Sequence, residues 1–119
     1  MLIGTDITVI SRIERLFEKF GDKAYKRYLN ESEIELIKSS STAAGFWAAK
    51  EAFSKALGCG IGAELSFLDI FIAKTSKNQP YIVLTPHLKK KFNIKSISLS
   101  IAHDGGFAIA VVAVVLDNK

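Results

Sequence analysis

Two carboxylates and one lysine are the side chains in this sequence best suited to chemistry: Asp6, Glu51 and Lys55. Oxygen ligands without clustered His or Cys favour Mg²⁺ over Zn²⁺. Mg²⁺ typically takes one or two carboxylates and completes its shell with water and substrate phosphates, which Lys55 would face as a point charge. Asp6 and Glu51 are far apart in the sequence, so their spacing alone does not show that they lie close together in the fold. The alternative interpretation is an ordinary i, i+4 ion pair between Glu51 and Lys55.

Glu51 and Lys55 belong to a segment that predicts one covered helix running into a glycine-rich loop, Phe46 to Gly62 (FWAAKEAFSKALGCGIG). Its apolar residues recur at the i, i+3, i+4 spacing of a core-facing stripe: Phe46, Ala49, Phe53, Ala56 and Leu57. A charge in a covered helix costs on the order of several kcal/mol unless it is paired or bound to a metal. Lys50 falls on the phenylalanine side, where a purely structural design would not put it.

The glycine-rich loop, Cys59 and His103 are weaker candidates for chemistry. The loop follows a helix, whereas a Walker-type phosphate loop precedes one, so a tight turn is the favoured interpretation. Cys59 is interpreted as a small residue of that loop, because no His or Asn lies near it in sequence to activate a nucleophile. His103, beside Asp104 at a strand end, is either a ligand contact or a structural histidine.

Length and composition predict one soluble globular domain spanning residues 1–119. The order of its expected elements, a strand, then helices, then a meander of strands, predicts the α+β class. The net charge of +4 favours anionic partners such as phosphates or acidic proteins but falls short of a nucleic-acid footprint. The single cysteine excludes an internal disulfide and suits a reducing compartment. The chain opens on a strand-like pattern, so we expect no signal peptide. The longest apolar run, Phe107 to Leu116, is too short for a membrane span.

The N-terminal part predicts a strand, Leu2 to Ile7, that ends at Asp6 before Thr8 caps a helix reaching Phe20. The outward face of that helix is basic, either as a solvated surface or as a docking surface for an acidic partner: Arg12, Arg15 and Lys19.

Two short helices should follow, Lys23 to Leu29 and Glu31 to Lys38. Asp22 is the expected N-cap of the first, and Asn30 with Glu33 outlines a capping box for the second. A polar linker, Ser39 to Thr42, then caps the central helix.

After the glycines the pattern becomes extended. Strands are predicted at Ser66 to Lys74, Pro80 to Leu84, Lys95 to His103 and Phe107 to Leu116, with a short helix from Thr85-Pro86 to Phe92. Asp104-Gly105-Gly106 predicts a hairpin between the last two, and the order favours an antiparallel sheet. The strand from Phe107 has no polar alternation, so we expect both its faces to be covered, one of them by a neighbouring subunit.

Three groups of residues carry a resemblance to a known family. They are the Gly4-Thr5-Asp6-Ile7 opening with Arg12-Ile13 behind it, the block Phe46 to Gly58 (FWAAKEAFSKALG), and Pro80-Tyr81. Together they resemble holo-[acyl-carrier-protein] synthases, the small, single-domain type of 4′-phosphopantetheinyl transferase. The match covers nearly the whole chain, and the central block is highly specific. The resemblance implies an α+β fold assembling as a homotrimer with active sites at the subunit interfaces.

The resemblance also implies an activity: Mg²⁺-dependent transfer of 4′-phosphopantetheine from coenzyme A to a serine of apo-acyl carrier protein. Adenosine 3′,5′-bisphosphate would be released, in support of fatty acid biosynthesis in the cytoplasm. Asp6 and Glu51 match the family's Mg²⁺ ligands, and Lys55 matches its phosphate-contacting lysine. The general base stays open between Glu51 and a metal-ordered water, with Glu33 a less favoured third candidate.

The substrate contacts are carried over in the same way. Ser100-Ile101-Ala102-His103 matches the family's Ser-Ile-Ser/Thr-His strand end, which implies that His103 lies near the coenzyme. Arg12 and Arg15 lie on the helix that the family offers to the acidic helix of its carrier protein. Ala102 departs from the family pattern, because a hydroxyl is expected there.

A second departure concerns the 3′-phosphate of the coenzyme. Family members often carry Lys or Arg just before the central helix to hold this phosphate. This chain has Ser39 to Thr42 and then Gly45-Phe46 in that region. Lys38 is the residue considered as a substitute for the missing cation. Two rival classes stay open: a non-enzymatic module that binds acidic proteins or nucleic acid through the basic helix, and a degenerate structural paralogue. The first leaves the charges of the central helix unexplained.

Overall fold

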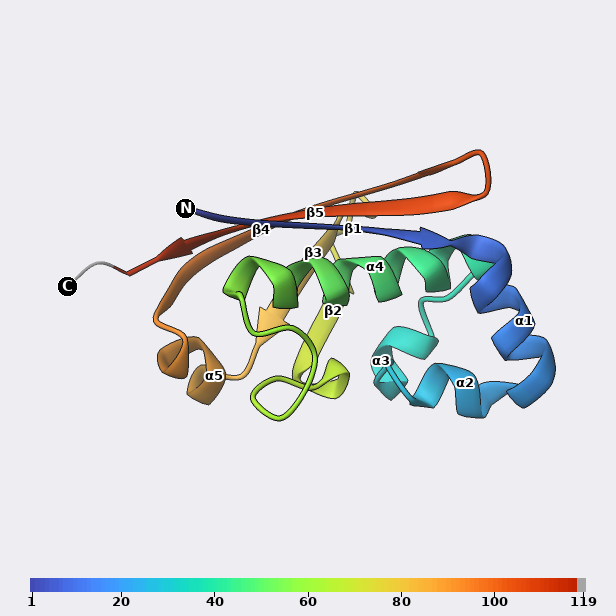
Figure 1. Ribbon diagram of the computed structural model, residues 1–119, viewed down its shortest axis with the longest axis horizontal. Coiled ribbons are helices and arrows are strands. Elements are labelled where there is room, and N and C mark those ends of the chain that lie inside the picture. The colour runs from blue at the N-terminus through green and yellow to red at the C-terminus, as the bar shows by residue number, and fades with distance from the viewer. Residues whose placement is uncertain (118–119) are drawn as a thin grey trace.

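A three-stranded antiparallel sheet and one long helix organise the chain in a computed structural model that describes residues 1–117. The sheet has the order β1-β5-β4, from β1 (Leu2–Val9), β5 (Phe107–Leu116) and β4 (Ile94–Asp104). Helix α4 (Ser40–Leu57) runs beneath it and packs against β1 and β5 (Figure 1). A separate antiparallel pair joins β2 (Ile70–Lys74) to β3 (Pro80–Leu84). The α+β class and its antiparallel sheet are confirmed.

The remaining helices lie on the same side of the sheet as α4 (Figure 1). They are α1 (Ile10–Phe20), α2 (Asp22–Lys26), α3 (Glu31–Ile34) and α5 (Pro86–Lys91), with a 3₁₀ turn at Phe67–Asp69. Several predicted boundaries were wrong. The N-caps of α1 and α2 are Val9 and Gly21 rather than Thr8 and Asp22, and the predicted strand from Ser66 begins only at Ile70.

Helix α4 begins earlier than the apolar pattern predicted, because the hydroxyl of Ser39 accepts a hydrogen bond from the Thr42 backbone amide and caps it. The expected polar linker is therefore its first turn. The helix ends at Gly58, whose left-handed φ of 81° and amide bond to the Lys55 carbonyl form the C-cap. The glycine-rich loop thus starts as a helix stop, as predicted.

Gly4 permits the close contact between β1 and α4. A Cβ atom at this position would meet the Ala52 carbonyl oxygen at 1.9 Å and the Ala56 amide nitrogen at 2.5 Å. Because both contacts are to backbone, no side-chain rotation would relieve them. Alanines on the facing side of α4 are fully buried, so helix and strand approach as closely as their backbones allow. This contact sets the position of Asp6, two residues along the strand.

We expect Gly4→Ala to destabilise the protein by about 3 kcal/mol or more, because overpacking against backbone forces whole elements apart. Urea unfolding at equilibrium measures the loss. Gly62→Ala is the matched control, since a Cβ at that position has open space around it. Equal stability of the two variants would contradict the tight β1–α4 contact.

Lys50 and Glu33 form a buried ion pair that explains the lysine on the phenylalanine side of α4. Both side chains are fully buried, and Lys50 Nζ lies 2.8 Å from Glu33 Oε1. Lys50 also donates to the carbonyl oxygens of Tyr28 and Phe67, and Glu33 accepts from the Ile72 amide. Burial lowers the pKa of Lys50, and the bond to Glu33 opposes that shift. The expectation that Lys50 had no structural place was therefore wrong.

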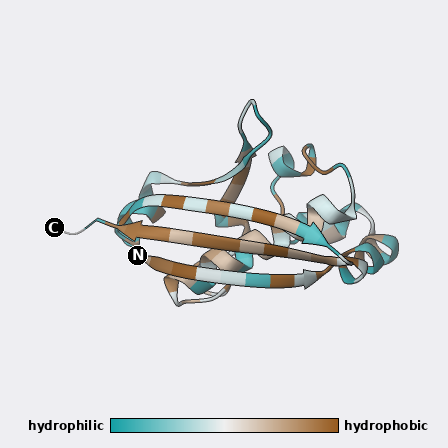
Figure 2. Ribbon diagram, turned by 90° about the horizontal axis from the view of Figure 1, so that it is seen from above, coloured by the Kyte–Doolittle hydropathy of each residue, from teal (hydrophilic) through white to brown (hydrophobic). Residues whose placement is uncertain are grey.

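The face of the sheet opposite α4 carries apolar side chains that the single chain leaves exposed. Within one chain, one face of β5 is covered: its even-numbered residues Ala108 to Val114 are buried while Phe107, Ile109 and Val111 are exposed. Cover of the other face by a neighbouring subunit stays a prediction. Ile3 and Ile7 of β1 lie on the same side and are 63 % and 60 % exposed. Figure 2 looks down on this sheet and shows β5 hydrophobic along most of its length. We call this surface the outer face.

Candidate active site

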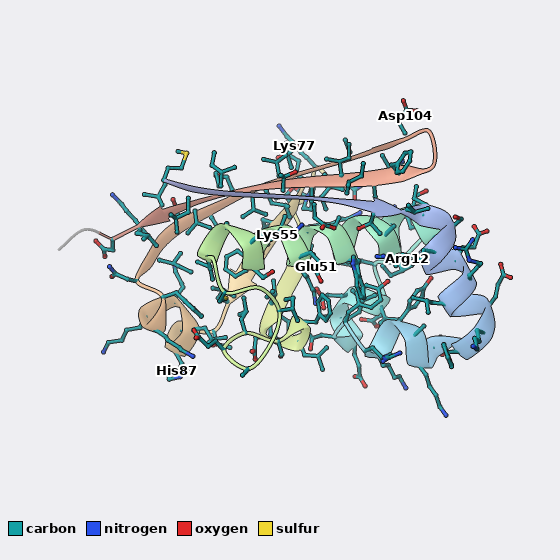
Figure 3. All side chains as sticks on the ribbon, viewed as in Figure 1. Arg12, Glu51, Lys55, Lys77, His87 and Asp104 are labelled. Atoms are coloured by element: carbon teal, nitrogen blue, oxygen red, sulfur yellow. The ribbon has the colours of Figure 1, made fainter. Side chains whose placement is uncertain are left out.

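One side of α4 presents Trp47, Glu51 and Lys55 at successive turns beside β1. Figure 3 shows Lys55, Glu51 and Arg12 following one another along the length of this helix. Glu51 is half-buried and Lys55 is exposed. The helical spacing predicted from sequence therefore holds, and α1 adds Arg12 at the same side.

Asp6 meets Lys55 across the contact between β1 and α4. Lys55 Nζ donates to Asp6 Oδ1 at 2.9 Å and lies 3.4 Å from the Thr5 carbonyl oxygen. Asp6 does not end its strand as predicted; it pairs with Ala110 inside β1, which runs on to Val9. The alternative interpretation, an ion pair within the helix, is wrong because the partner of Lys55 is Asp6 and not Glu51.

Glu51 lies close enough to Asp6 for the two carboxylates to interact. Burial raises the pKa of Glu51, the negative charge of Asp6 raises it further, and the positive charges of Lys55 and Arg12 oppose the rise. Two acids placed together with partial burial repel each other unless a cation lies between them.

The donor set fits a hard divalent cation. Within residues 1–117 no three His, Cys, Asp or Glu side chains come together, so a cation here would have two protein carboxylates. That set is too small for a closed structural site but suits Mg²⁺, which takes one or two carboxylates and leaves positions for water and phosphate oxygens. Asp6 and Glu51 are the residues that would hold it.

An apolar cavity opens beside Arg12 at the far end of this helix face. The Arg12 guanidinium lies over the Trp47 ring, 5.6 Å from its centroid. The cavity holds about 340 Å³ and is lined by Leu16, Phe20, Ala24, Arg27, Tyr28, Trp47 and Phe67. Arg15 and Lys19 are exposed on the same helix as Arg12. The sequence showed the basic residues of this surface, but the cavity depends on contacts between distant segments.

His103 lies away from this site in a single chain. It is in β4, paired with Ala108, and β5 separates β4 from β1. Neighbouring strands are about 4.8 Å apart, so roughly 10 Å of sheet lies between them. His103 instead lines a cavity of about 220 Å³ with Thr42, Gly45, Phe46, Lys74, Asn78, Pro80 and Ile101. No pattern in the sequence predicted that Lys74 would lie at this cavity. Lys38 lines a different cavity, beside Phe17 and Tyr25.

Two further candidates prove structural. Glu33 was considered as a general base, but it is fully buried and both its oxygens accept hydrogen bonds, from Lys50 and the Asn30 and Ile72 amides. Cys59 is a free cysteine in the loop after α4, and partial burial raises the pKa of its thiol, which disfavours the reactive thiolate.

Comparison with known proteins decides the family. The model of the 4′-phosphopantetheinyl transferase superfamily matches residues 2–112. The chain belongs to this superfamily. A holo-[acyl-carrier-protein] synthase of Nautilia profundicola is 65 % identical over 93 % of this chain and 96 % of the relative.

Solved structures agree with that assignment. The Helicobacter pylori holo-[acyl-carrier-protein] synthase in complex with coenzyme A superposes with a TM-score of 0.93 at 55 % identity, covering 96 % of this chain and all of the other. The Neisseria meningitidis enzyme superposes with a TM-score of 0.87 at 33 % identity, over 97 % and 99 % of the two chains. The predicted family, enzyme class and fold are therefore confirmed. Across residues 1–117, no helix of this transferase has the length and apolar character needed to cross a bilayer.

Proposed function

We propose that this transferase moves 4′-phosphopantetheine from coenzyme A to a serine of apo-acyl carrier protein, with Mg²⁺ as its cation. Adenosine 3′,5′-bisphosphate would be the second product, and we place the reaction in the cytoplasm, in fatty acid biosynthesis. The observation that carries the proposal is the meeting of Asp6, Glu51 and Lys55 at the β1–α4 contact. The H. pylori relative bound to coenzyme A supports the donor substrate.

The chain's own residues have separable tasks. Bound at Asp6 and Glu51, the cation would neutralise and orient the pyrophosphate of the coenzyme for in-line attack. Lys55, exposed and tethered to Asp6, is free to turn its ammonium group toward charge developing on the leaving phosphate. Burial of Glu33 removes it as a base, which leaves Glu51 or an ordered water to take the proton of the serine hydroxyl.

A homotrimer would complete the site. The outer face leaves several large apolar side chains exposed, and exposed apolar patches often mark surfaces that bind another protein chain. Asp6 lies at the β1 edge and His103 at the β4 edge of the same sheet. If neighbouring subunits join these edges, His103 of one chain would reach the coenzyme held by Asp6 and Glu51 of the next. This arrangement agrees with the active sites at subunit interfaces that the family resemblance implies.

The carrier protein would dock on α1 and the apolar cavity beside it. Arg12, Arg15 and Lys19 are exposed along two turns of α1, and Leu16 and Phe20 of the same helix line the cavity. A basic stripe next to an apolar hollow suits a small acidic protein with an apolar contact residue. Arg12 connects the two regions, since it covers Trp47 and lies within electrostatic range of Glu51.

Charge reversal at Arg12 or Arg15 should raise KM for the carrier protein by about tenfold, or about 1.4 kcal/mol, because the stripe attracts an acidic partner. KM for coenzyme A should change little, since its pyrophosphate is held by the cation and Lys55. Steady-state kinetics at low and high salt measure both constants. Lys90→Glu, an exposed charge reversal on α5, is the matched control. Unchanged carrier-protein kinetics at low salt would mean that the docking surface lies elsewhere.

Lys74 is the cation we assign to the 3′-phosphate of the coenzyme. It lies in the cavity with His103, and its Nζ is over the Phe46 ring, 5.8 Å from the centroid. Thr42 adds a hydroxyl near the N-terminal end of α4, where anions are favoured. Lys38, the substitute considered from sequence, lines another cavity. The 3′-phosphate would thus be held by β2 and not by the segment before α4.

Lys74→Ala should raise KM for coenzyme A by about tenfold while KM for dephospho-coenzyme A, which lacks the 3′-phosphate, stays unchanged. Comparing the two donors in the same assay isolates the phosphate contact from general damage. Lys77→Ala, in the exposed turn between β2 and β3, is the control. An equal loss for both donors would contradict the assignment.

A direct test of the function follows both products. Release of adenosine 3′,5′-bisphosphate, measured by chromatography, should require coenzyme A, Mg²⁺ and apo-carrier protein together. A carrier protein whose acceptor serine is changed to alanine should give no release. Binding of carrier protein without any product, at all metal concentrations, would favour the non-enzymatic module considered above.

A further inference from the structure

Thr8 is a buried threonine on the helix-facing side of β1. It is 1 % exposed and shares that side of the strand with Gly4 and Asp6. A valine would fill the same space, and a buried hydroxyl without a partner costs free energy. The Thr8 hydroxyl donates to Asp6 Oδ2 at 2.9 Å. The sequence predicted a helix cap here, so this contact gives the hydroxyl a different task.

The two oxygens of the Asp6 carboxylate are held by two different donors. Lys55 binds Oδ1, and Thr8 binds Oδ2, both at 2.9 Å. The donors differ in rigidity. The Lys55 side chain is 52 % exposed on a long flexible stem, whereas Thr8 is buried and β-branched, so its χ1 is stiff. Thr8 is therefore the donor that fixes the rotation of the carboxylate when Lys55 turns to a substrate.

We propose that Thr8 is a positioning residue for the cation site: its hydroxyl fixes Oδ2 and so keeps Oδ1 on the side of the carboxylate that Lys55 contacts. The inference rests on the proposed function, because it takes Asp6 as a cation ligand. Partners that orient ligating carboxylates typically contribute 10- to 100-fold in metal affinity. Without the hydroxyl, the carboxylate would have to lose its rotational freedom on binding, at a cost in affinity.

Mn²⁺ binding to the free protein tests this without any turnover, since the electron paramagnetic resonance signal of free Mn²⁺ falls as the ion binds. Thr8→Val, which keeps the shape and loses the donor, should raise Kd by about tenfold. Thr8→Ser keeps the donor and should stay within about twofold of the parent. Thr5→Val, on the same strand with an exposed side chain, is the matched control and should bind as the parent does.

In the transfer assay, Thr8→Val should shift the Mg²⁺ concentration for half-maximal rate by a similar factor, while kcat recovers at saturating Mg²⁺. A structural role alone would lower kcat or stability without moving this dependence. Equal Mn²⁺ affinity of parent and Thr8→Val would overturn the positioning role and leave the proposed function standing. Failure of the parent itself to bind Mn²⁺ would overturn both the cation assignment and this inference.

Discussion

Glu51→Gln should lower kcat/KM for transfer by about a thousandfold or more. The amide keeps the shape of the side chain but removes the negative charge that would hold a cation beside Asp6, and the several kcal/mol that a bound cation supplies correspond to such a factor. The carrier-protein modification rate, measured at saturating Mg²⁺, gives the ratio. Lys55 keeps Asp6 as its partner, so the local ion pair survives the change.

The control for this variant must separate chemistry from folding. Glu35→Gln changes an exposed carboxylate outside the site and should leave the rate unchanged. Circular dichroism and urea unfolding should show Glu51→Gln folded, because Glu51 makes no ion pair with Lys55. A folded Glu51→Gln protein with near-normal turnover would remove Glu51 from the cation site.

Two impaired variants should recover activity when they assemble together. One carries Glu51→Gln in the cation site beside β1, and the other carries His103→Ala with Lys74→Glu in the cavity beside β4, so that each damages a different half of the proposed shared site. In a trimer with sites between subunits, equal mixing leaves both halves intact at about one interface in four, so about a quarter of the parent activity should return. The two variants must be co-refolded or co-expressed, so that trimers containing both kinds of subunit form.

Sedimentation identifies the assembly in the same samples. The family resemblance leads us to expect a trimer at working concentration, and the exposed apolar outer face offers a surface through which the subunits could associate. A monomer that does not associate with concentration, or a mixture with no more activity than its parts, would contradict a site shared between subunits.

The sequence predicted elements well where local signals decide them. The hairpin at Asp104-Gly105-Gly106 and the strand Phe107–Leu116 were correct, because a turn motif and a continuous apolar run are local features. Thr8 was misjudged because a threonine before an amphipathic segment is also a good cap signal. Its hydroxyl instead binds Asp6 within the strand, which no local pattern distinguishes.

The site was only partly predictable because its contacts are long-range. Asp6 and Lys55 are 49 positions apart and meet only because Gly4 lets β1 approach α4. Lys50 and Glu33 are 17 positions apart, and nothing in the sequence predicts that they pair. Lys50, which belongs to a structural ion pair, was therefore interpreted from sequence as a lysine with no structural role. The specific block around Glu51 indicated the family. The structure shows which of its charges is buried in an ion pair, Lys50, and which lie at the candidate site, Glu51 and Lys55.

The mass of the carrier protein tests the central claim most directly. Apo-acyl carrier protein is incubated with coenzyme A, Mg²⁺ and this chain, and intact-protein mass spectrometry follows the product. The account predicts a gain of one 4′-phosphopantetheine group, lost when the metal is chelated and when Glu51→Gln replaces the parent. An unchanged carrier-protein mass with folded, trimeric protein and saturating Mg²⁺ would contradict it.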